Sequence, residues 1–360
     1  MVLMAAMNTR SEQPSVWCLL GRKAGDNAQV RALAEEIGFP MVEKTLCAQP
    51  WEWVMHLGSF AGLGGIDRRS SSLLEAPWPD LLITSGRRNE PVANWIRRQS
   101  GGHTKLVHIG RPWFALDNYE FVVTTPQYFL PHQSNIVHNQ LPLYRLLPSE
   151  IQTAQQQFAP RWQHLPRPWF AVLVGGDSGR FVFTLDKARH LGRECNRLAE
   201  AAGGSLLISD SPRTSTEAGN VLLEHISVPH FSYRCAANTE NPYRAFLAEA
   251  DEFVVTGESM SMLAETASQG KPLHIFDMGD GDMPWWQLRH NYRHKPLSHR
   301  LAMRFGPVRM RRDVGKIQQA LVRSGRANWL GSTTSTPPPA TADGELASTA
   351  ELIRRRLQPD

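Results

Sequence analysis

The chain has 360 residues, of which 41% are hydrophobic and 20% charged, enough for two domains with real hydrophobic cores. Its formal charge of +5 favours anionic partners, but no basic run with interleaved aromatic residues is present, so nucleic acid is not an expected partner. Four cysteines without CxxC spacing and the lack of an apolar run of roughly 18 residues argue against a zinc site, a disulfide framework and a membrane span. We therefore expect a cytoplasmic protein, with peripheral contact at the inner membrane left open.

The first half of the chain alternates apolar strand patterns with helical ones. Apolar residues at helical spacing in 27–37, followed by Gly38, predict a helix that ends at this glycine. A second helix is expected to end near Ser100. Strands are expected at 15–20, 41–46, 80–84, 104–109 and 120–124. This alternation predicts a parallel sheet covered by helices on both faces.

A stretch rich in Pro, Gln and Arg, residues 142–168, separates this alternation from a second one. The second alternation places helices at about 185–202 and 216–225, with a short helix after Pro242. Its strands are expected at 169–174 and 205–209, near residue 230, and at 252–255.

The two alternations predict an α/β fold of two Rossmann-like domains that face each other across a cleft, where a small ligand should bind. We expect an acceptor-side domain at 15–150 and a nucleotide-binding domain at 165–282. Helices in 283–325 are expected to return to the first domain. Residues 331–344 are rich in Ser, Thr and Pro and are predicted to be disordered, and a short helix is expected at 345–357.

Residues 256–276 carry the strongest ligand signal, because they read as strand end, turn, helix and next strand. Gly257 allows a tight turn, and Ser259 or Ser261 can cap the helix that follows. The start of a helix favours a phosphate, and Glu265, about two turns in, can accept hydrogen bonds from sugar hydroxyls. The alternative is a strand–turn–helix unit that serves packing alone.

Two further loops follow the first strand of each domain. Gly175 and Gly176, within residues 174–180, allow backbone N–H groups to converge on an anion, although a plain tight turn is the alternative. In the first domain, Asp26 is either a general base or the cap of a helix that begins at residue 27. Asn27 and Gln29 are candidate acceptor contacts.

Two more positions lie at strand ends of the first domain, and one loop suggests a metal. Arg87 can hold an anionic acceptor or pair with nearby acids, and His108 is expected to be a partly buried histidine with its hydrogen bonds satisfied. Residues 277–282 resemble a metal loop but lack the EF-hand spacing and its glutamate. No His/Cys cluster has metal-ligand spacing, so no metal site is expected.

The Gly-containing turns, the linker and the C-terminal helices resemble glycosyltransferases of the GT-B fold, in particular the peptidoglycan enzyme that adds N-acetylglucosamine to a lipid-linked sugar. Gly257, Ser259 and Glu265 match that family's nucleotide-holding motif, whereas its first-domain Gly-Gly-x-Gly-Gly-His loop is replaced here by residues 25–27.

Most of residues 15–305 also resembles the mitochondrial-fission elongated-mitochondria protein family. The likeness rests on Trp17, 25–29, 79–83, 86–87, 174–176 and 256–262. The resemblance implies recruitment of a fission GTPase at a membrane surface, but the N-terminus is not Arg-rich and amphipathic as a mitochondrial targeting segment would be.

Together, the resemblances imply an inverting, metal-independent glycosyltransferase without a cofactor. Its donor would be a nucleotide-sugar, with UDP favoured, and its acceptor a lipid- or envelope-linked molecule. The expected donor contacts are Gly175, Gly176, Ser178, Thr256, Gly257, Glu258, Ser259, Met260 and Glu265. Asp26 is the expected base, and the acceptor-side contacts are Gly25, Asn27, Gln29 and Arg87.

Two alternatives stay open at this point. A non-catalytic adaptor would keep the fold and act by protein contacts at a membrane surface. A nucleotide-sugar epimerase would need an acid/base pair around the anomeric carbon, which the sequence does not single out.

Overall fold

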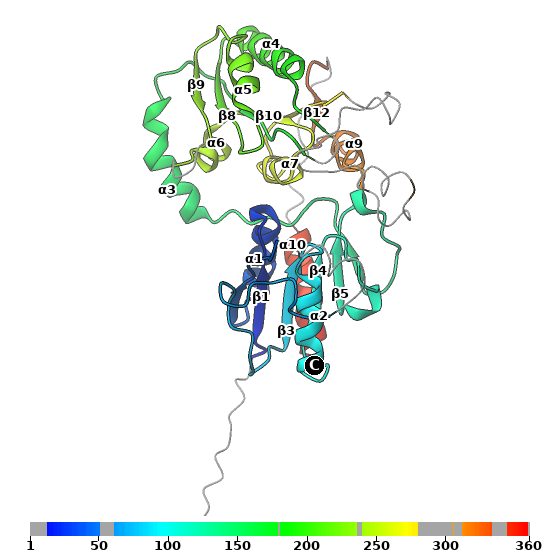
Figure 1. The fold of residues 1–360 in the computed structure, drawn as a ribbon. Coiled ribbons are helices and arrows are strands. Elements are labelled where there is room, and N and C mark those ends of the chain that lie inside the picture. The colour runs from blue at the N-terminus through cyan, green and yellow to red at the C-terminus, as the bar shows by residue number, and fades with distance from the viewer. Residues whose placement is uncertain are drawn as a thin grey trace, which may run out of the picture. The chain divides into compact units, whose positions relative to one another are not determined.

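A computed structural model describes most of the chain (Figure 1). The described residues are 13–50, 61–178, 181–235, 240–279, 305, 312–332 and 344–358. The chain forms two compact units. Unit 1 comprises Met1–Thr124, Leu130–Asn139 and Gly344–Asp360, and unit 2 comprises Thr125–Phe129 and Gln140–Asp343.

Unit 1 is built on a six-stranded parallel sheet in the order β2-β1-β3-β4-β5-β6. Its strands are β1 (Val16–Leu20), β2 (Met41–Thr45), β3 (Leu81–Ser85), β4 (Lys105–Ile109), β5 (Phe121–Thr124) and β6 (Ile136–His138). Its α-helices are α1 (Ala24–Ile37), α2 (Glu90–Gln99) and α10 (Glu345–Leu357). Every residue of β1 and β3 is buried, as expected of largely apolar strands that are covered on both faces.

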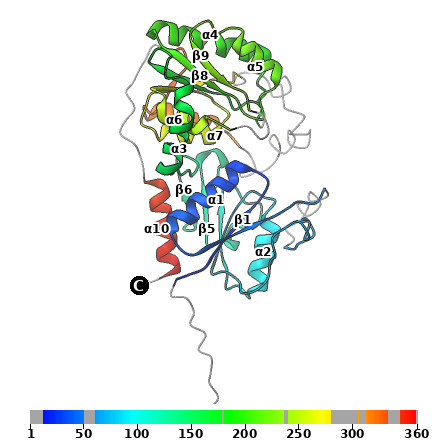
Figure 2. The same ribbon diagram turned by 90° about the vertical axis from the view of Figure 1, so that its left-hand side faces the viewer.

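Helix α10 packs against α1 although more than 300 residues separate them in sequence (Figure 2). Arg354 donates from Nε to the carbonyl oxygen of Ile37 at 2.9 Å and from Nη2 to that of Glu36 at 2.6 Å. These bonds satisfy carbonyls in the last turn of α1, where a cation is favoured by the helix dipole. The arginines of this helix are therefore committed to protein contacts, since Arg356 also pairs with Glu120.

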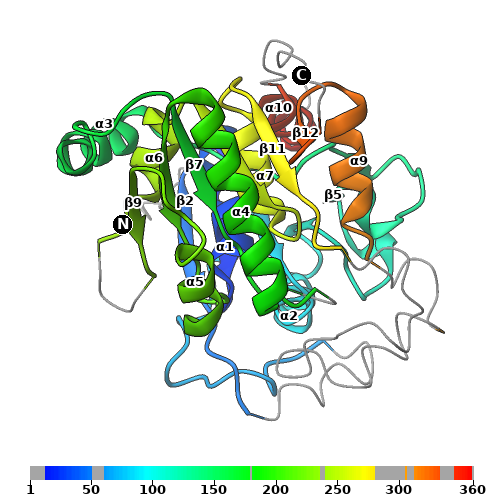
Figure 3. The same cartoon turned by 90° about the horizontal axis from the view of Figure 1, so that it is seen from above.

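Unit 2 has a second six-stranded parallel sheet, in the order β12-β11-β10-β7-β8-β9. Figure 3 labels β7, β9, β11 and β12 of this sheet. Its strands are β7 (Trp169–Leu173), β8 (Ser205–Ser209), β9 (His230–Tyr233), β10 (Glu252–Thr256), β11 (Leu273–Phe276) and β12 (Asn328–Trp329). Its described α-helices are α3 (Pro148–Phe158), α4 (Leu185–Ala202), α5 (Thr216–Leu223), α6 (Tyr243–Glu249), α7 (Met260–Ala267) and α9 (Gly315–Arg323). A core of aromatic and branched side chains, which includes Trp162, Phe170, Phe246 and Phe253, packs beneath this sheet's helices.

The two sheets confirm the predicted fold class, α/β with two Rossmann-like units. Several segments have a different place from the one expected. Helix α3 lies inside the predicted linker, and α9 belongs to unit 2 rather than returning to the first domain. Most of 283–311 and residues 333–343 of the expected disordered tail lie outside the described residues. Among the described helices, none is long and apolar enough to cross a membrane.

Candidate functional site

The strand order of unit 2 reverses between β7 and β10, because β8 lies on one side of β7 and β11 lies on the outer side of β10. Ligands of open α/β sheets bind at the carboxyl ends of the strands at such a switch point. Here β7 runs into the Gly175–Gly176 turn, and β10 runs through Gly257 and Glu258 into α7. The predicted donor residues around these two turns therefore lie side by side.

A short hydrogen-bond chain joins the two turns. The backbone N–H of Gly175 donates to Oγ1 of Thr256 at 2.8 Å, and that hydroxyl lies 3.2 Å from Oε1 of Glu258. Since the hydroxyl accepts from Gly175, its own proton points to the carboxyl group of Glu258. The Glu258 side chain is only 2% exposed, and its Oε2 has no hydrogen-bond partner among the described residues. Burial raises the pKa of Glu258 to about 7, against the opposing charge of Arg213.

Arg213 adds a cation that the sequence predictions missed. It lies in the loop after β8, where its Nη1 donates to the carbonyl oxygen of Asp177 at 3.2 Å and its own carbonyl accepts from the Asp177 N–H at 3.0 Å. Burial lowers its pKa, and the charge of Glu258 works in the opposite direction. The position of Arg213 just after a strand was a sequence signal for a site residue. The sequence does not show, however, which loops lie next to it, because that depends on the order of the strands in the sheet.

The absence of a side chain at Gly175 lets these groups meet. A Cβ at this position would lie 2.1 Å from Oε1 of Glu258, 2.7 Å from Cβ of Ser259 and 3.1 Å from Nη2 of Arg213. Gly176 has φ of +83°, and a Cβ there would lie 2.5 Å from the Arg213 carbonyl. Both glycines are therefore required by close approach, and not by turn geometry alone.

The loop after β7 has few backbone donors left for an anion. The N–H of Gly175 is bound by Thr256, and that of Ser178 donates to the carbonyl oxygen of Phe181 at 3.0 Å. Helix α7 is different, because it begins at Met260 and the side chain of its N-cap residue, Ser259, makes no capping hydrogen bond. The first N–H groups of α7 are thus the better anion donors at this switch point.

The turn between β10 and α7 is fixed from α9. Gln318 donates from Nε2 to the carbonyl oxygen of Gly257 at 2.5 Å, and the Gly257 N–H donates to the carbonyl oxygen of Phe276 at 3.0 Å. A Cβ at Gly257 would meet the Gln318 amide at 2.5 Å. The lack of a side chain at Gly257 therefore lets the buried side chain of Gln318 reach the turn between β10 and α7.

Glu265 is held inside unit 2. Its Oε2 accepts a hydrogen bond from the hydroxyl of Tyr243 on α6, and burial raises the pKa of its carboxyl group. The role of Glu265 as a clamp for sugar hydroxyls stays a prediction, for which its Oε1 would be the oxygen available.

In unit 1 the strand order reverses between β1 and β3, and Asp26 lies at that point. Helix α1 begins at Ala24, so Asp26 is in its first turn and is not its cap, which excludes the capping alternative. Its Oδ2 is 3.5 Å from Nζ of Lys23 and 3.2 Å from the place of a Cβ at Gly86. Its side chain is 31% exposed, so the carboxylate is open to a ligand.

The other acceptor-side residues are mostly engaged within unit 1. The amide of Asn27 bonds both the N–H and the carbonyl oxygen of Gly21, at 2.9 and 2.8 Å, and so closes the loop between β1 and α1. Gln29 is half-buried and donates weakly to the carbonyl oxygen of Gly25 at 3.4 Å. Arg87 stacks over the ring of Trp113 at 4.7 Å.

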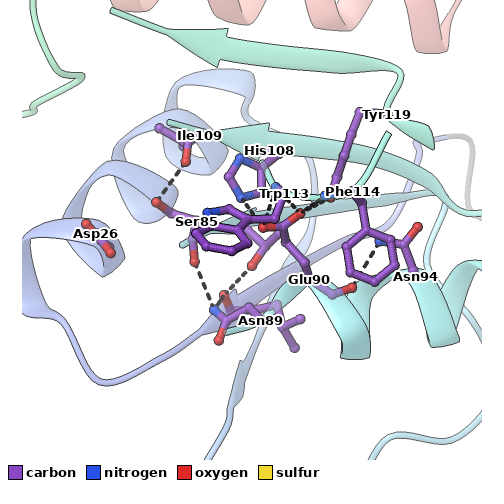
Figure 4. Close-up of polar contacts among 12 residues, drawn as sticks. Asp26, Ser85, Asn89, Glu90, Asn94, His108, Ile109, Trp113, Phe114 and Tyr119 are labelled. Carbon is purple, nitrogen blue, oxygen red and sulfur yellow. Dashed lines mark hydrogen bonds and ion pairs between the residues drawn. The ribbon is translucent and has the colours of Figure 1, made fainter. Parts of the chain in front are cut away.

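A buried carboxyl group, Glu90, organises the loop after β4 (Figure 4). It accepts from the N–H groups of Trp113 and Phe114, at 2.9 and 3.0 Å, and from the hydroxyl of Tyr119 at 2.7 Å. His108 is fully buried beside it, 4.0 Å away, and neither ring nitrogen has a hydrogen-bond partner in the described part of the chain. The expected partial burial was wrong, since His108 is fully buried. Burial lowers the pKa of His108 to about 3 and keeps the ring neutral.

The described residues contain no cluster of three or more His, Cys, Asp or Glu side chains that could hold a metal ion. The groups described at the two switch points are a buried carboxyl, a guanidinium and a helix start in unit 2, and an accessible carboxylate in unit 1.

Comparison with known proteins gives a family and a set of fold relatives. The family model described as Mitochondrial fission ELM1 matches residues 24–330. Mitochondrial fission protein ELM1 of Arabidopsis thaliana is 24% identical over 237 residues, which cover 60% of this chain and 55% of that protein. The chain spans between 55% and 64% of the length of the curated relatives it matches.

Two solved structures are similar at low sequence identity. MurG of Acinetobacter baumannii is 13% identical with a TM-score of 0.43, and the alignment covers 96% of this chain and 92% of MurG. A UDP-glucosyltransferase from Polygonum tinctorium is 10% identical with a TM-score of 0.49, and the alignment covers 98% of this chain and 100% of that enzyme.

Proposed function

This chain belongs to the Mitochondrial fission ELM1 family, and we propose that it acts as a GT-B-type glycosyltransferase. Its donor would be a nucleotide-sugar, with UDP favoured, and its acceptor a lipid- or envelope-linked hydroxyl at the membrane surface. The observation that carries the proposal is the meeting of Arg213, Glu258 and the start of α7 over Gly175, at the switch point of unit 2.

This arrangement suits a diphosphate. A guanidinium supplies charge-assisted donors to phosphate oxygens, and a helix start adds oriented N–H groups and a partial positive charge. Both are fixed before the ligand arrives, so they stabilise the negative charge that develops on the leaving diphosphate without further reorganisation. Glu265 of α7 would bind the ribose hydroxyls.

The transfer step needs a base for the acceptor hydroxyl. Asp26 would take that proton while the acceptor oxygen attacks the anomeric carbon and the nucleoside diphosphate departs, which inverts the anomeric configuration. Gly25, Asn27, Gln29 and Arg87 would line the acceptor side, with Arg87 attracting an anionic acceptor.

Calorimetric titration with UDP, GDP and CMP tests the donor assignment. We expect saturable binding, tightest for UDP, and a loss of about tenfold or more in Arg213→Met, because a charged hydrogen bond to phosphate is removed. Arg189→Met is the matched control, since this arginine of α4, whose side chain is 39% exposed, pairs with Asp186 of its own helix. Failure of all three nucleotides to bind at millimolar concentration would refute the donor assignment.

Asp26→Asn tests the base. We expect this variant to bind UDP as the wild type does and to lose sugar transfer, measured as release of UDP from a UDP-sugar in the presence of membrane lipids. The control Asp186→Asn changes an exposed carboxylate of α4 and should retain full activity. Equal activity of Asp26→Asn and wild type would show that another group takes the proton.

The family name favours a second candidate, a non-catalytic adaptor that acts by protein contacts at a membrane surface. In that case Asp26→Ala and Glu265→Ala would leave function in cells intact. Removal of 345–357 is a poor test, because α10 packs against α1 and its loss would expose apolar surface of unit 1. Leu352→Asp is better, since this side chain of α10 is 43% exposed and contributes little to the core.

A further inference from the structure

The unpaired carboxyl oxygen of Glu258 is a feature that the donor site alone does not explain. Oε1 has the hydroxyl of Thr256 as its partner at 3.2 Å, whereas Oε2 is buried and has no hydrogen-bond partner among the described residues. A buried ionised oxygen without a donor is costly, so the group must either carry a proton or receive a hydrogen bond from a ligand.

The position of Glu258 decides between these two states. The residue directly precedes Ser259, the N-cap of α7, so its carboxyl group lies where the helix start attracts anions. Its Oε1 and the Cβ of Ser259 both approach the place of the missing Cβ at Gly175, and Nη2 of Arg213 lies 3.1 Å from that same place. An anion bound by Arg213 and α7 would therefore lie against this carboxyl group, and two negative charges at contact distance cannot both persist.

The charged groups around Glu258 come from three elements. Arg213 in the loop after β8 favours its ionised form, and Asp177 in the loop after β7 opposes it. Arg312, which precedes α9, acts on Arg213. Burial outweighs the attraction of Arg213, so that the pKa of Glu258 is about 7 before any ligand binds. An approaching anion raises it further, which favours the protonated form in the complex.

We propose that the ligand's phosphate binds against the protonated carboxyl group of Glu258, with Oε2–H donating a hydrogen bond to a phosphate oxygen. Ligand and proton then bind together: one proton passes from solvent to Oε2, and no other bond is made or broken. The inference rests on the proposed function and deepens it, because it assigns a donor to the same diphosphate site. It makes donor binding pH-dependent, with tight binding at or below neutral pH.

Calorimetry in buffers of different ionisation enthalpy measures this proton directly. UDP-N-acetylglucosamine and sulfate are suitable probes, because neither a diphosphate diester nor sulfate titrates between pH 6 and 9, so any proton taken up belongs to the protein. For wild type we expect uptake close to one proton at pH 8 and affinity that falls about tenfold per pH unit above the pKa of the free protein.

Two variants isolate the group. Glu258→Gln keeps the donor and the shape, so it should bind within about threefold of wild type at pH 6, without proton uptake and without the fall at high pH. Glu258→Ala removes the donor and should bind more weakly at pH 6. Glu90→Gln is the matched control, since Glu90 is another buried carboxyl group with a raised pKa but lies in unit 1, and this variant should retain the proton uptake. Thermal unfolding of each variant confirms that it is folded.

The outcomes separate this inference from the proposed function. UDP-N-acetylglucosamine binding without proton uptake, or a Glu258→Gln variant as weak as Glu258→Ala at pH 6, would overturn the protonated donor and leave the nucleotide site standing. Sulfate binding with proton uptake that Glu258→Gln removes, but no binding of the nucleotide-sugar, would support the protonated donor and overturn the proposed function. Failure of both probes to bind would overturn both.

Discussion

Replacement of Gly175 by alanine is the most direct test of how tightly the switch point of unit 2 is assembled. The added Cβ would lie 2.1 Å from Oε1 of Glu258 and 2.7 Å from Cβ of Ser259, well inside the separation of non-bonded atoms. The carboxyl end can rotate away, but only by breaking its bond with Thr256 at 3.2 Å. The Ser259 Cβ is attached to the first turn of α7 and can move only with that backbone.

Overpacking of a closely packed site by one methyl group costs about 1–3 kcal/mol, and we expect the upper half of that range because two neighbours must move. For a unit of about 200 residues, each kcal/mol lowers the melting temperature by roughly 2–4 °C. In a Glu258→Ala background the first clash disappears while the Ser259 contact remains, so the cost of Gly175→Ala should shrink without vanishing.

Chemical denaturation of the four proteins of this double-mutant cycle gives the free energies of unfolding, and calorimetry with UDP gives the loss of binding. Gly25→Ala is the stability control, because Gly25 lies in α1 with no atom within 4 Å of an added Cβ, and its replacement should leave unfolding unchanged or slightly improved. A Gly175→Ala protein as stable as wild type, with UDP affinity intact, would refute the close approach on which the site depends.

Three further predictions follow from buried or paired groups. Glu90→Ala should lower the free energy of unfolding by about 3 kcal/mol or more, because the N–H donors of the loop after β4 lose their acceptor. Tyr119→Phe should lower it by about 1–2 kcal/mol. Urea denaturation of both variants tests whether Glu90→Ala is the more destabilising. Arg354→Ala should lower the free energy of unfolding by about 1–2 kcal/mol, because Arg354 binds carbonyl oxygens of α1. Arg355→Ala should lower it by less than about 0.5 kcal/mol, because Arg355 pairs with the partly exposed Glu351. Equal melting temperatures of the two variants would contradict this. The pKa of Glu258 in the folded protein, about 7, lies above the ordinary value of 4.5. The contribution of Glu258 to the free energy of unfolding is therefore full below pH 4.5, and about 3 kcal/mol of it is lost as the pH rises to 7. Glu258→Gln should remove this pH dependence from the denaturation profile.

Strand and helix positions were predictable where the sequence carries local signals. The short apolar runs of β1, β3 and β8 are typical of buried strands. The glycine after Ile37 ended α1 as expected, with Gly38 at φ of +79°. Helix α3 was missed because its polar sequence, Pro148–Phe158, buries only two residues and shows weak apolar periodicity. Local composition there resembled a linker, and the helix packs against α6, a tertiary contact that local sequence does not reveal.

The candidate site was predictable only in part, because its members come together through strand order. The turns around Gly175 and Gly257 were found from their glycines, but Arg213 follows β8 and meets them only because β8 is the neighbour of β7. The state of Glu258 was hidden as well. A glutamate in a turn is ordinarily exposed, and nothing in the sequence indicates that one of its oxygens is buried without a partner.

The switch points of the two units differ in how many of their hydrogen-bond donors and acceptors lack a protein partner. In unit 1 the amide of Asn27 is bound to Gly21, and that of Asn89 donates to the carbonyl oxygens of Leu19 and Ser85 at 3.1 and 3.2 Å. These side chains close the strand ends and have little left for a ligand, so Asp26 is the carboxylate that stays accessible there.

In unit 2 the opposite holds, because Oε2 of Glu258 has no partner and Nη2 of Arg213 makes no hydrogen bond among the described residues. Unused donors and acceptors in a buried place cost stability, and such a cost is ordinarily offset when a ligand completes the missing bonds. The asymmetry argues that unit 2 is the binding unit and that any chemistry contributed by unit 1 depends on Asp26. The two functions proposed here therefore separate at this residue: Asp26→Asn should abolish sugar transfer by a transferase, whereas it should leave the protein contacts of an adaptor intact.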